Sequence, residues 1–283
     1  MLNVDLHSHS TVSDGMLAPA DVAKRAKANG VDVWALTDHD EVSGIVEART
    51  AARDLGLRFI PGVEISITWA GKTIHIVGLN IDETNQDLIR GLAATRGGRE
   101  QRGHAMAEQL AAAGVPDAFE GALEYVGNPD LISRTHFARY IVEKGICADT
   151  SEVFRRYLIE GKPGFVPHRW AALKDAVGWI RGAGGVAIVA HPGRYKIEQI
   201  AFDAFLMEFK QCGGTAIEVV TGSHTPDQYE RYAGVAKAYG LLASRGSDFH
   251  GPGESLVDLG TLPPLPANVQ PVWQDWVCDF GAA

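Results

Sequence analysis

The sequence predicts an α/β fold in which short strands alternate with helices, arranged as a barrel or as an open sheet. Apolar segments of strand length recur in the first and last thirds of the chain, separated by segments of helical length. The middle of the chain lacks this alternation and has helical character throughout. Strands that alternate with helices are typical of parallel βαβ units.

The first third contains four expected strands and two expected helices. The first helix opens with Pro19, and Asn29 followed by Gly30 ends it, which is the usual order of start and stop signals. Ala70 and Gly71 join the third and fourth strands as a hairpin. The expected strands are Asn3–His7, Val31–Leu36, Leu57–Ile67 and Thr73–Asn80, and the expected helices are Pro19–Asn29 and Val42–Leu55.

The rest of the chain divides into a helical segment and a second α/β segment. Breakers such as Asn128-Pro129 separate helical stretches between residues 101 and 167. We expect residues 101–167 to form a small helical insertion that covers the active site. Residues 1–100 and 168–283 are then expected to form one domain that carries the site. The later strands are expected at Gly185–Ala190, Ala216–Val220 and Leu241–Ser244.

Composition and charge restrict the classes of function. The chain has 283 residues, of which 46% are hydrophobic, and its net charge of −9 argues against electrostatic binding of long nucleic acid. No apolar run approaches the ~20 residues of a membrane span, and the N-terminus lacks the pattern of a signal peptide. Cys147, Cys212 and Cys278 form no paired motif, which is typical of free thiols in a reducing compartment. We expect a cytoplasmic protein without a membrane or an obligate protein partner.

Histidines and carboxylates gather where the expected strands end. His7 and His9 are two residues apart at the end of the first strand, so their side chains point to the same face. The C-terminal ends of strands are where barrels and open α/β sheets assemble their sites. Imidazole and carboxylate groups together suit Zn²⁺, Mn²⁺ or Fe²⁺. The expected metal ligands are His7, His9, Asp14, His39, Glu64, His75, His191, Asp248 and His250.

Each of these residues taken alone has an ordinary structural explanation. Asp14 before Gly15 is a common turn residue, and Glu64 after Pro61-Gly62 could cap a helix. An isolated His39 or His75 is more often hydrogen-bonded within the fold than bound to a metal. The repeated placement of such residues at strand ends, in order along the chain, is what predicts a metal centre.

The order of the nine expected ligands resembles the PHP family, named for its polymerase and histidinol-phosphatase members. The resemblance extends from the first residues to about Gly260. It implies a distorted (β/α)7 barrel that holds two or three divalent metal ions, with Mn²⁺ expected and Zn²⁺ or Fe²⁺ left open. The implied division gives one ion to His7, His9, Glu64 and Asp248, a second to Glu64, His75 and His191, and a third to Asp14, His39 and His250.

Three further segments resemble a narrower branch of this family. These segments are Arg134–Arg139, in which Thr135 replaces the commoner proline, Gly161–Pro167 and Ser223–Gln228. The branch acts on 3′,5′-bisphosphonucleotides and short 5′-phosphorylated oligoribonucleotides. The resemblance therefore implies hydrolysis of the 3′-phosphate of a small phosphorylated substrate, such as pAp to AMP and phosphate. A hydroxide held by the metal ligands is the expected nucleophile.

Several residues outside the ligand set are expected to contact the substrate. Arg134 and Arg194 are expected to bind phosphate, because a guanidinium matches it bidentately. With Arg134, His136 is expected to hold a second phosphate, although a structural role is equally open. His224 is expected either to bind the substrate, to donate the catalytic proton or to be structural, and His168 is expected to line the cleft.

The recurrence of arginine at spacing three around the start of the insertion has a simpler explanation. Arg96, Arg99 and Arg102 would share one face of a helix, and a solvated face is the better expectation for them.

Three other functions compete with this prediction. Histidinol phosphate is an alternative substrate for the same chemistry. An amidohydrolase-type enzyme that cleaves C–N bonds also opens with HxH. Its usual set of metal ligands, however, does not include residues equivalent to Asp14, His39 and the late Asp248-x-His250. A non-catalytic nucleotide-binding or metal-binding module is disfavoured because none of the nine ligand positions has been lost.

Overall fold

The computed structural model describes residues 2–276, and its strands form one seven-stranded sheet that follows the chain order from β1 to β7. Every strand expected from the sequence is present. Of the three cysteines, Cys278 lies outside the described residues. The strands are β1 (Val4–Asp5), β2 (Val33–Leu36), β3 (Arg58–Trp69), β4 (Lys72–Leu79), β5 (Val186–Val189), β6 (Ala216–Thr221) and β7 (Leu242–Gly246).

The sheet curls until its first and last strands meet. All neighbouring strands are parallel except β4, which is antiparallel to both β3 and β5. Beside β1, the Leu6 N–H donates to the carbonyl of Arg245 at 3.0 Å, and the Asp248 N–H donates to the carbonyl of His7 at 2.9 Å. The fold is therefore a nearly closed, distorted (β/α)7 barrel, which confirms the expected fold class.

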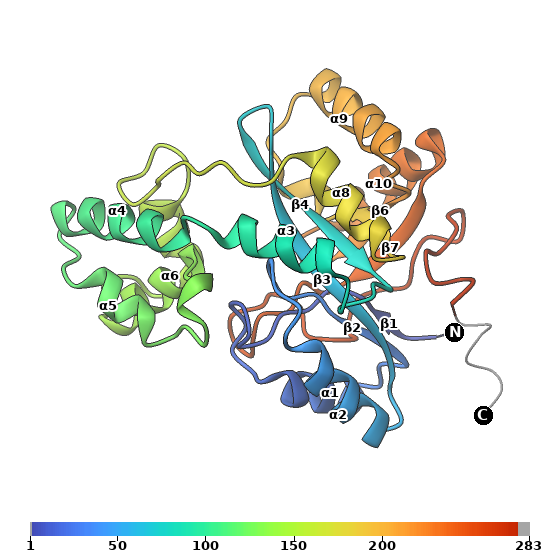
Figure 1. Cartoon of the computed structure of the whole chain (residues 1–283), viewed down its shortest axis with the longest axis horizontal. Helices are drawn as coiled ribbons and strands as arrows, with labels where there is room; N and C mark the ends of the chain where they lie inside the picture. The colour runs from blue at the N-terminus through green and yellow to red at the C-terminus, as the bar shows by residue number, and fades with distance from the viewer. Residues whose placement is uncertain (1, 277–283) are drawn as a thin grey trace.

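Helices cover the outer face of this barrel (Figure 1). Both helices expected in the first third are present, although the second begins at Ile45 and not at Val42. No helix within residues 2–276 is long and apolar enough to cross a membrane. The barrel helices are α1 (Pro19–Ala28), α2 (Ile45–Asp54), α3 (Gln86–Arg96), α8 (Leu173–Gly182), η3 (Pro192–Arg194), α9 (Gln199–Cys212) and α10 (Pro226–Tyr239).

The strands are buried on both faces, which explains their unbroken apolar sequences. In β2, Val33 and Ala35 belong to an inner cluster with residues of other strands, whereas Trp34 and Leu36 pack against α1 and α2. A parallel sheet covered on both faces has continuous apolar strands of this kind. Polar side chains are consequently displaced to the strand ends, where the barrel opens.

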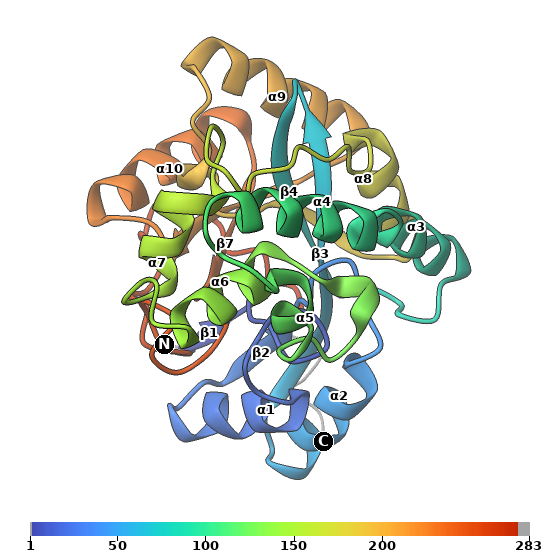
Figure 2. The same cartoon turned by 90° about the vertical axis from the view of Figure 1, so that its left-hand side faces the viewer.

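The middle of the chain forms a separate group of helices beside the barrel (Figures 1 and 2). It has its own apolar cluster, which includes Leu110, Phe137, Ile141 and Leu158 and no residue of the barrel strands. The expectation of a helical middle segment is thus confirmed. Its elements are α4 (Arg99–Ala112), α5 (Ala118–Leu123), η1 (Pro129–Leu131), α6 (Arg134–Glu143), α7 (Thr150–Val153) and η2 (Phe154–Leu158).

The closure of the barrel generates a first prediction at Gly246, the last residue of β7. A Cβ atom at this position would lie 2.3 Å from the Cβ of His7 and 2.6 Å from its backbone nitrogen. We expect Gly246→Ala to lower the free energy of unfolding by ~1–3 kcal/mol because β1 cannot move away without breaking the closure. Chemical denaturation measures this change.

Gly178→Ala is the matched control, because a Cβ atom at Gly178 in α8 meets no atom within 4 Å. A helical alanine in open space is expected to be neutral or stabilising. Equal stability of the two variants would contradict the proposed constraint at the barrel seam.

Candidate metal centre

The nine expected ligands come together at the mouth of the barrel. Most follow a strand end, as expected, but Glu64 and His75 lie inside β3 and β4. This hairpin is longer than the other strands, so its middle reaches the level at which they end. The remaining ligands are His7, His9 and Asp14 after β1, His39 after β2, His191 after β5, and Asp248 and His250 after β7.

The carboxylate of Glu64 lies at the centre of this group and is 1% exposed. Its Oε1 atom is 3.0 Å from His75 Nδ1 and 2.8 Å from His191 Nε2. Its Oε2 atom is 3.2 Å from His7 Nε2, 3.3 Å from His9 Nε2 and 3.1 Å from His39 Nδ1.

Two further carboxylates extend the cluster on either side of Glu64. The Oδ1 atom of Asp248 is 3.2 Å from His9 Nε2 and 3.5 Å from His7 Nε2. The Oδ1 atom of Asp14 is 3.4 Å from His250 Nε2 and 3.9 Å from His39 Nε2. Three sets of side chains have their donor atoms within 4.8 Å of one another, namely His7–His9–Glu64–Asp248, His9–Asp14–His39–His250 and His39–Glu64–His75.

The donor atoms fit divalent metal ions. Asp14 Oδ1, Glu64 Oε2 and Asp248 Oδ1 are buried and have no hydrogen-bond partner among the described residues. A buried carboxylate oxygen without a partner is costly unless a cation neutralises it. Nitrogen and oxygen donors in this proportion are a usual ligand set for Zn²⁺, Mn²⁺ and Fe²⁺.

The same carboxylates alter the protonation of the imidazoles. Burial lowers the pKa of His9, but hydrogen bonds to Asp248 and Glu64 outweigh burial and raise it to about 10. Burial lowers the pKa of His191 to about 4, and the nearby charge of Arg194 acts in the same direction. Protons and divalent cations compete for nitrogens such as those of His9, so metal uptake must release protons.

A second layer of carboxylates holds the ligands in position. Glu218, at the middle of β6, accepts a hydrogen bond from His7 Nδ1 at 2.7 Å and another from the His191 N–H at 2.6 Å. Asp38 accepts hydrogen bonds from Ser10 and Ser13 in the loop between His9 and Asp14. Sequence reasoning did not select Glu218, although a lone charged residue within an apolar strand is a usable signal.

Backbone strain also concentrates at this site. Asp40, His191 and Asp248 have positive φ angles of 50°, 25° and 57°, a region that non-glycine residues seldom adopt. Such conformations cost ~1–3 kcal/mol each and persist where surrounding contacts enforce them, often at functional sites.

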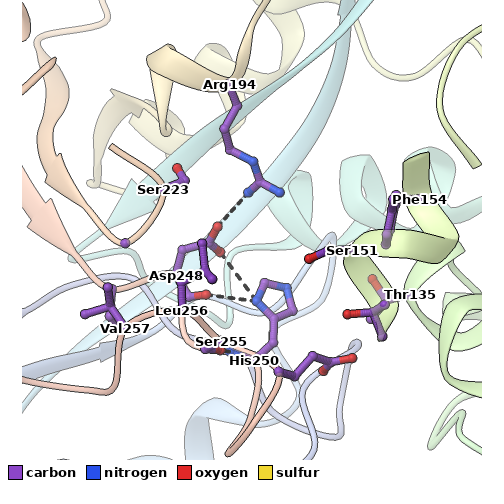
Figure 3. Close-up of a pocket in the computed structure, with 14 residues that line it drawn as sticks. Thr135, Ser151, Phe154, Arg194, Ser223, Asp248, His250, Ser255, Leu256 and Val257 are labelled. Atoms are coloured by element: carbon purple, nitrogen blue, oxygen red, sulfur yellow. Dashed lines mark hydrogen bonds and ion pairs between the residues drawn. The ribbon is translucent and has the colours of Figure 1, made fainter. Parts of the chain in front are cut away.

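A cleft between the insertion and the barrel leads to the metal centre. It has a larger part of about 480 Å³ and a smaller part of about 120 Å³. Both parts are lined by Thr135, Phe154, Arg194 and His250. Figure 3 shows Phe154 and Thr135 on one side of the larger part, with the loop that carries Leu256 opposite them.

Three of the five expected substrate-binding residues line this cleft. Arg194 is half exposed, and its Nη1 atom is 2.6 Å from Asp248 Oδ2 (Figure 3). Arg134 and His168 line the smaller part. Burial, with the charges of Arg194 and Arg99, lowers the pKa of Arg134 to about 10.

The other two expected substrate-binding residues make hydrogen bonds within the fold. His136 is fully buried, and its Nδ1 atom accepts a hydrogen bond from the Ser133 N–H at 3.0 Å, which caps α6. His224 accepts a hydrogen bond from the Gly193 N–H at 2.9 Å and donates one to the carbonyl of Val219 at 3.0 Å. Both nitrogens of His224 are engaged and neither histidine is among the residues that line the two parts of the cleft, which favours the structural role that the sequence left open for each.

The solvated face expected for Arg99 and Arg102 is wrong. Arg99 is 5% exposed, Arg102 is half-buried, and both line the smaller part of the cleft. Their guanidinium carbons lie 4.6 and 5.5 Å from the ring centroid of Trp170, which belongs to the segment that returns to the barrel. The sequence contains no local signal of this contact, because Trp170 is far along the chain.

Comparison with known proteins identifies relatives over nearly the whole chain. A 3′,5′-nucleoside bisphosphate phosphatase from Chromobacterium violaceum is 48% identical and covers 97% of this chain and 96% of its own length. A 5′-3′ exoribonuclease from Haemophilus influenzae is 42% identical and covers 95% of this chain and 97% of its own length. A family model described as the PHP domain matches residues 5–162.

Solved structures give the same fold. A structure from Chromobacterium violaceum described as an amidohydrolase with bound sulfate and no metal has a TM-score of 0.95 at 47% identity, covering 98% of this chain and 96% of that one. A candidate metal-dependent phosphoesterase from Bifidobacterium adolescentis has a TM-score of 0.81 at 27% identity, and it covers 98% of this chain and 94% of that one.

The donor cluster and these relatives define the class of protein: a metal-dependent hydrolase that acts on phosphoric ester bonds. Within that class, the chain belongs to the PHP family. The expectation of a phosphoesterase is thereby confirmed.

The hydrogen bonds of Glu218 generate a second prediction. Glu218→Gln keeps the size of the side chain but weakens the contact that orients His7. We expect the affinity for Mn²⁺ to fall ~10–100-fold, the usual cost of losing a carboxylate that orients a ligand. Competition with a fluorescent chelator measures the affinity, and circular dichroism monitors the fold.

Glu230→Gln is the control, because it removes an equal charge from an exposed position of α10. Unchanged affinity in a folded Glu218→Gln variant would show that Glu218 does not position the ligands.

Proposed function

We propose that this protein hydrolyses the 3′-phosphate of 3′,5′-bisphosphonucleotides, such as pAp to AMP and phosphate, and also cleaves short 5′-phosphorylated oligoribonucleotides. The observation that carries the proposal is a cluster of imidazoles and carboxylates that opens directly into a cleft lined by arginines. The names of the two relatives described above, 48% and 42% identical over nearly the whole chain, support the nucleotide as the substrate class.

We infer that the nine ligands hold two or three divalent ions, with Mn²⁺ as the expected metal. The geometry supports the division implied by the resemblance, with three differences. His9 also approaches the set around Asp14, and His39 also approaches the set around Glu64 and His75. His191 is not part of that last set, although its Nε2 atom lies 2.8 Å from Glu64 Oε1. Bound divalent ions would neutralise charge on the phosphoryl group and activate water.

The residues of the chain would orient the substrate around this centre. Arg194 is fixed by Asp248, so its remaining N–H groups are available to the scissile phosphate. Arg134 and His168 line the smaller part of the cleft and would contact the rest of the substrate. His224 would act indirectly, because its bond to Gly193 positions the turn that carries Arg194.

The helical segment of residues 101–167 is proposed as an insertion domain that covers the active site. Arg102, Arg134 and Phe154 of this segment line the cleft, which supports the proposal. The barrel domain would consist of residues 1–100 and 168–283. A cytoplasmic location agrees with the free thiols of Cys147 and Cys212.

A third prediction concerns the metal and the substrate together. Chelation is expected to abolish phosphate release, and Mn²⁺, Zn²⁺ or Fe²⁺ to restore it better than Mg²⁺, because imidazole-rich sites disfavour hard cations. Phosphate release is measured from pAp, 3′-AMP, histidinol phosphate and an anilide. Full activity without metal, or preference for the anilide, would refute the proposed function, and preference for histidinol phosphate would replace its substrate.

A fourth prediction tests Asp248, whose unpaired Oδ1 faces the imidazoles. Asp248→Asn removes the charge at nearly constant volume. We expect turnover to fall by more than the ~10–100-fold cost of losing an outer partner of a ligand. The control is Asp227→Asn at an exposed position of α10. Near-normal turnover with full metal content would show that Asp248 is not a ligand.

A further inference from the structure

The expected metal ligands fall into two groups that different parts of the fold hold in place. The side chain of His7 and the backbone N–H of His191 both donate to Glu218, which belongs to strand β6 of the barrel. These ligands are therefore held from within the barrel. A second group contacts the helical insertion, and its members are the ligands of the third expected ion, Asp14, His39 and His250.

Asp14 is held at two points by helix α6 of the insertion. The hydroxyl of Ser133, the N-cap residue of α6, donates to Asp14 Oδ2 at 3.3 Å. The Nη2 atom of Arg139, further along the same helix, donates to the backbone carbonyl of Asp14 at 2.6 Å. The other carboxylate oxygen, Oδ1, is buried without a hydrogen-bond partner among the described residues and lies 3.4 Å from His250 Nε2. The two contacts with α6 therefore leave Oδ1 available to a cation at the metal centre.

Arg139 also holds the loop that follows His250. Its Nε and Nη2 atoms donate to the two carboxylate oxygens of Glu254 at 3.2 and 2.6 Å. The side chains of Arg139 and Glu254 are 9% and 12% exposed, so solvent and salt screen this pair less than a surface pair. The hydroxyl of the next residue, Ser255, accepts a hydrogen bond from the His250 N–H at 2.7 Å (Figure 3). One arginine thus joins the loop after β1 to the loop after β7.

The third ligand, His39, is linked to the insertion through the residue that follows it. The buried carboxylate of Asp40 accepts a hydrogen bond at 2.5 Å from Arg99, the first residue of α4. Asp40 has a φ angle of 50°, a conformation that persists where surrounding contacts enforce it. Each ligand of this group is therefore held by the insertion, either directly or through a nearby residue of its own loop.

The position of the insertion on the barrel depends on such polar contacts. The insertion folds around its own apolar cluster, which contains no residue of the barrel strands. Gly98, which precedes α4, has a φ angle of 85°, which glycine adopts without steric cost. Interfaces between units of this kind are more polar than permanent interfaces and usually permit relative motion. A ligand group that spans the interface is complete only while the insertion is docked.

We propose that Arg139 and Ser133 are positioning residues of the metal centre, and that docking of the insertion on the barrel assembles the site of the third ion. The inference rests on the metal ligands of the proposed function but not on its substrate. Binding of this ion and docking of the insertion then stabilise each other, because a coupling free energy acts equally in both directions. The ions held from within the barrel bind without this coupling.

Arg139→Gln tests the coupling through metal binding, without substrate. Arg139 lines neither part of the cleft, so its loss removes no expected substrate contact. Metal-free protein is titrated with Mn²⁺ against a fluorescent chelator, and plasma mass spectrometry counts the bound ions. We expect Arg139→Gln to weaken the binding of one ion ~10–100-fold, the usual cost of losing an outer partner of a ligand, and to leave the other ions unchanged. Arg139→Lys is expected to lose less, because it keeps the charge.

Three further variants identify the ion that is affected. His250→Ala removes a ligand of this group and is expected to abolish the same binding step, so that adding Arg139→Gln changes nothing further. Glu218→Gln is expected to weaken the ions that Arg139→Gln leaves intact. Lys72→Gln is the matched control, because Lys72 pairs with Glu160 of the insertion at 3.0 Å but lies at the exposed tip of the β3–β4 hairpin. This control is expected to bind every ion as wild type does.

The titration separates the inference from the proposed function. Circular dichroism monitors the fold, and Glu254→Gln, which weakens the same pair from the loop, replaces Arg139→Gln if that variant does not fold. Wild-type affinity for every ion in the folded variant, equal weakening of all ions, or a titration that His250→Ala leaves unchanged overturns the inference. A wild type that binds the ions but hydrolyses no nucleotide overturns only the proposed function, because the titration uses no substrate.

Discussion

The burial of one carboxylate, that of Glu64, constrains the rest of this structure. Five imidazole nitrogens from three strand ends and the hairpin lie 2.8–3.3 Å from its two oxygens. A charge at 1% exposure is stable only if cations, as metal ions or protonated imidazoles, remain beside it. The barrel must therefore close. Only closure brings β1 and β7 next to each other, and it thereby keeps His7 and Asp248 in the same cluster of ligands around Glu64. The fold and the metal centre are mutually dependent.

Two carboxylates that are not themselves expected ligands, Glu218 and Asp40, connect the ligand cluster to the rest of the molecule. Glu218 links the ligands of β1 and β5, and Asp40 accepts hydrogen bonds from both Ser66 in β3 and Arg99 in α4. Asp40 immediately follows His39, so a single turn ties a metal ligand to the insertion. An arginine that lines the cleft is thereby anchored to the residue next to a metal ligand. The shape of the cleft and the position of the ligands therefore depend on the same contacts.

The parts of the structure that local sequence determines could be predicted, and the parts set by distant contacts could not. Apolar runs marked the strands because both faces of the sheet are buried, and ligands were recognisable because the barrel opens at the strand ends. For His136 the sequence left substrate contact and a structural role equally open, although Ser133-x-x-His136 resembles a capping box with histidine in the usual place of glutamate. Arg102 was misassigned, since its burial depends on Trp170, 68 positions further along the chain.

Charge distribution reconciles an acidic protein with an anionic substrate. The net charge of −9 opposes the approach of a long polyanion, which would cover much of the surface. The cleft has the opposite local sign, because Arg102 and Arg134 lack carboxylate partners among the described residues and bound metals would add further positive charge. Attraction confined to one cleft decays within about a Debye length, ~8 Å at physiological ionic strength. The proposed substrate, short and with two phosphates, can place both within that distance while keeping few charges on the acidic surface, so this distribution of charge agrees with the proposed function.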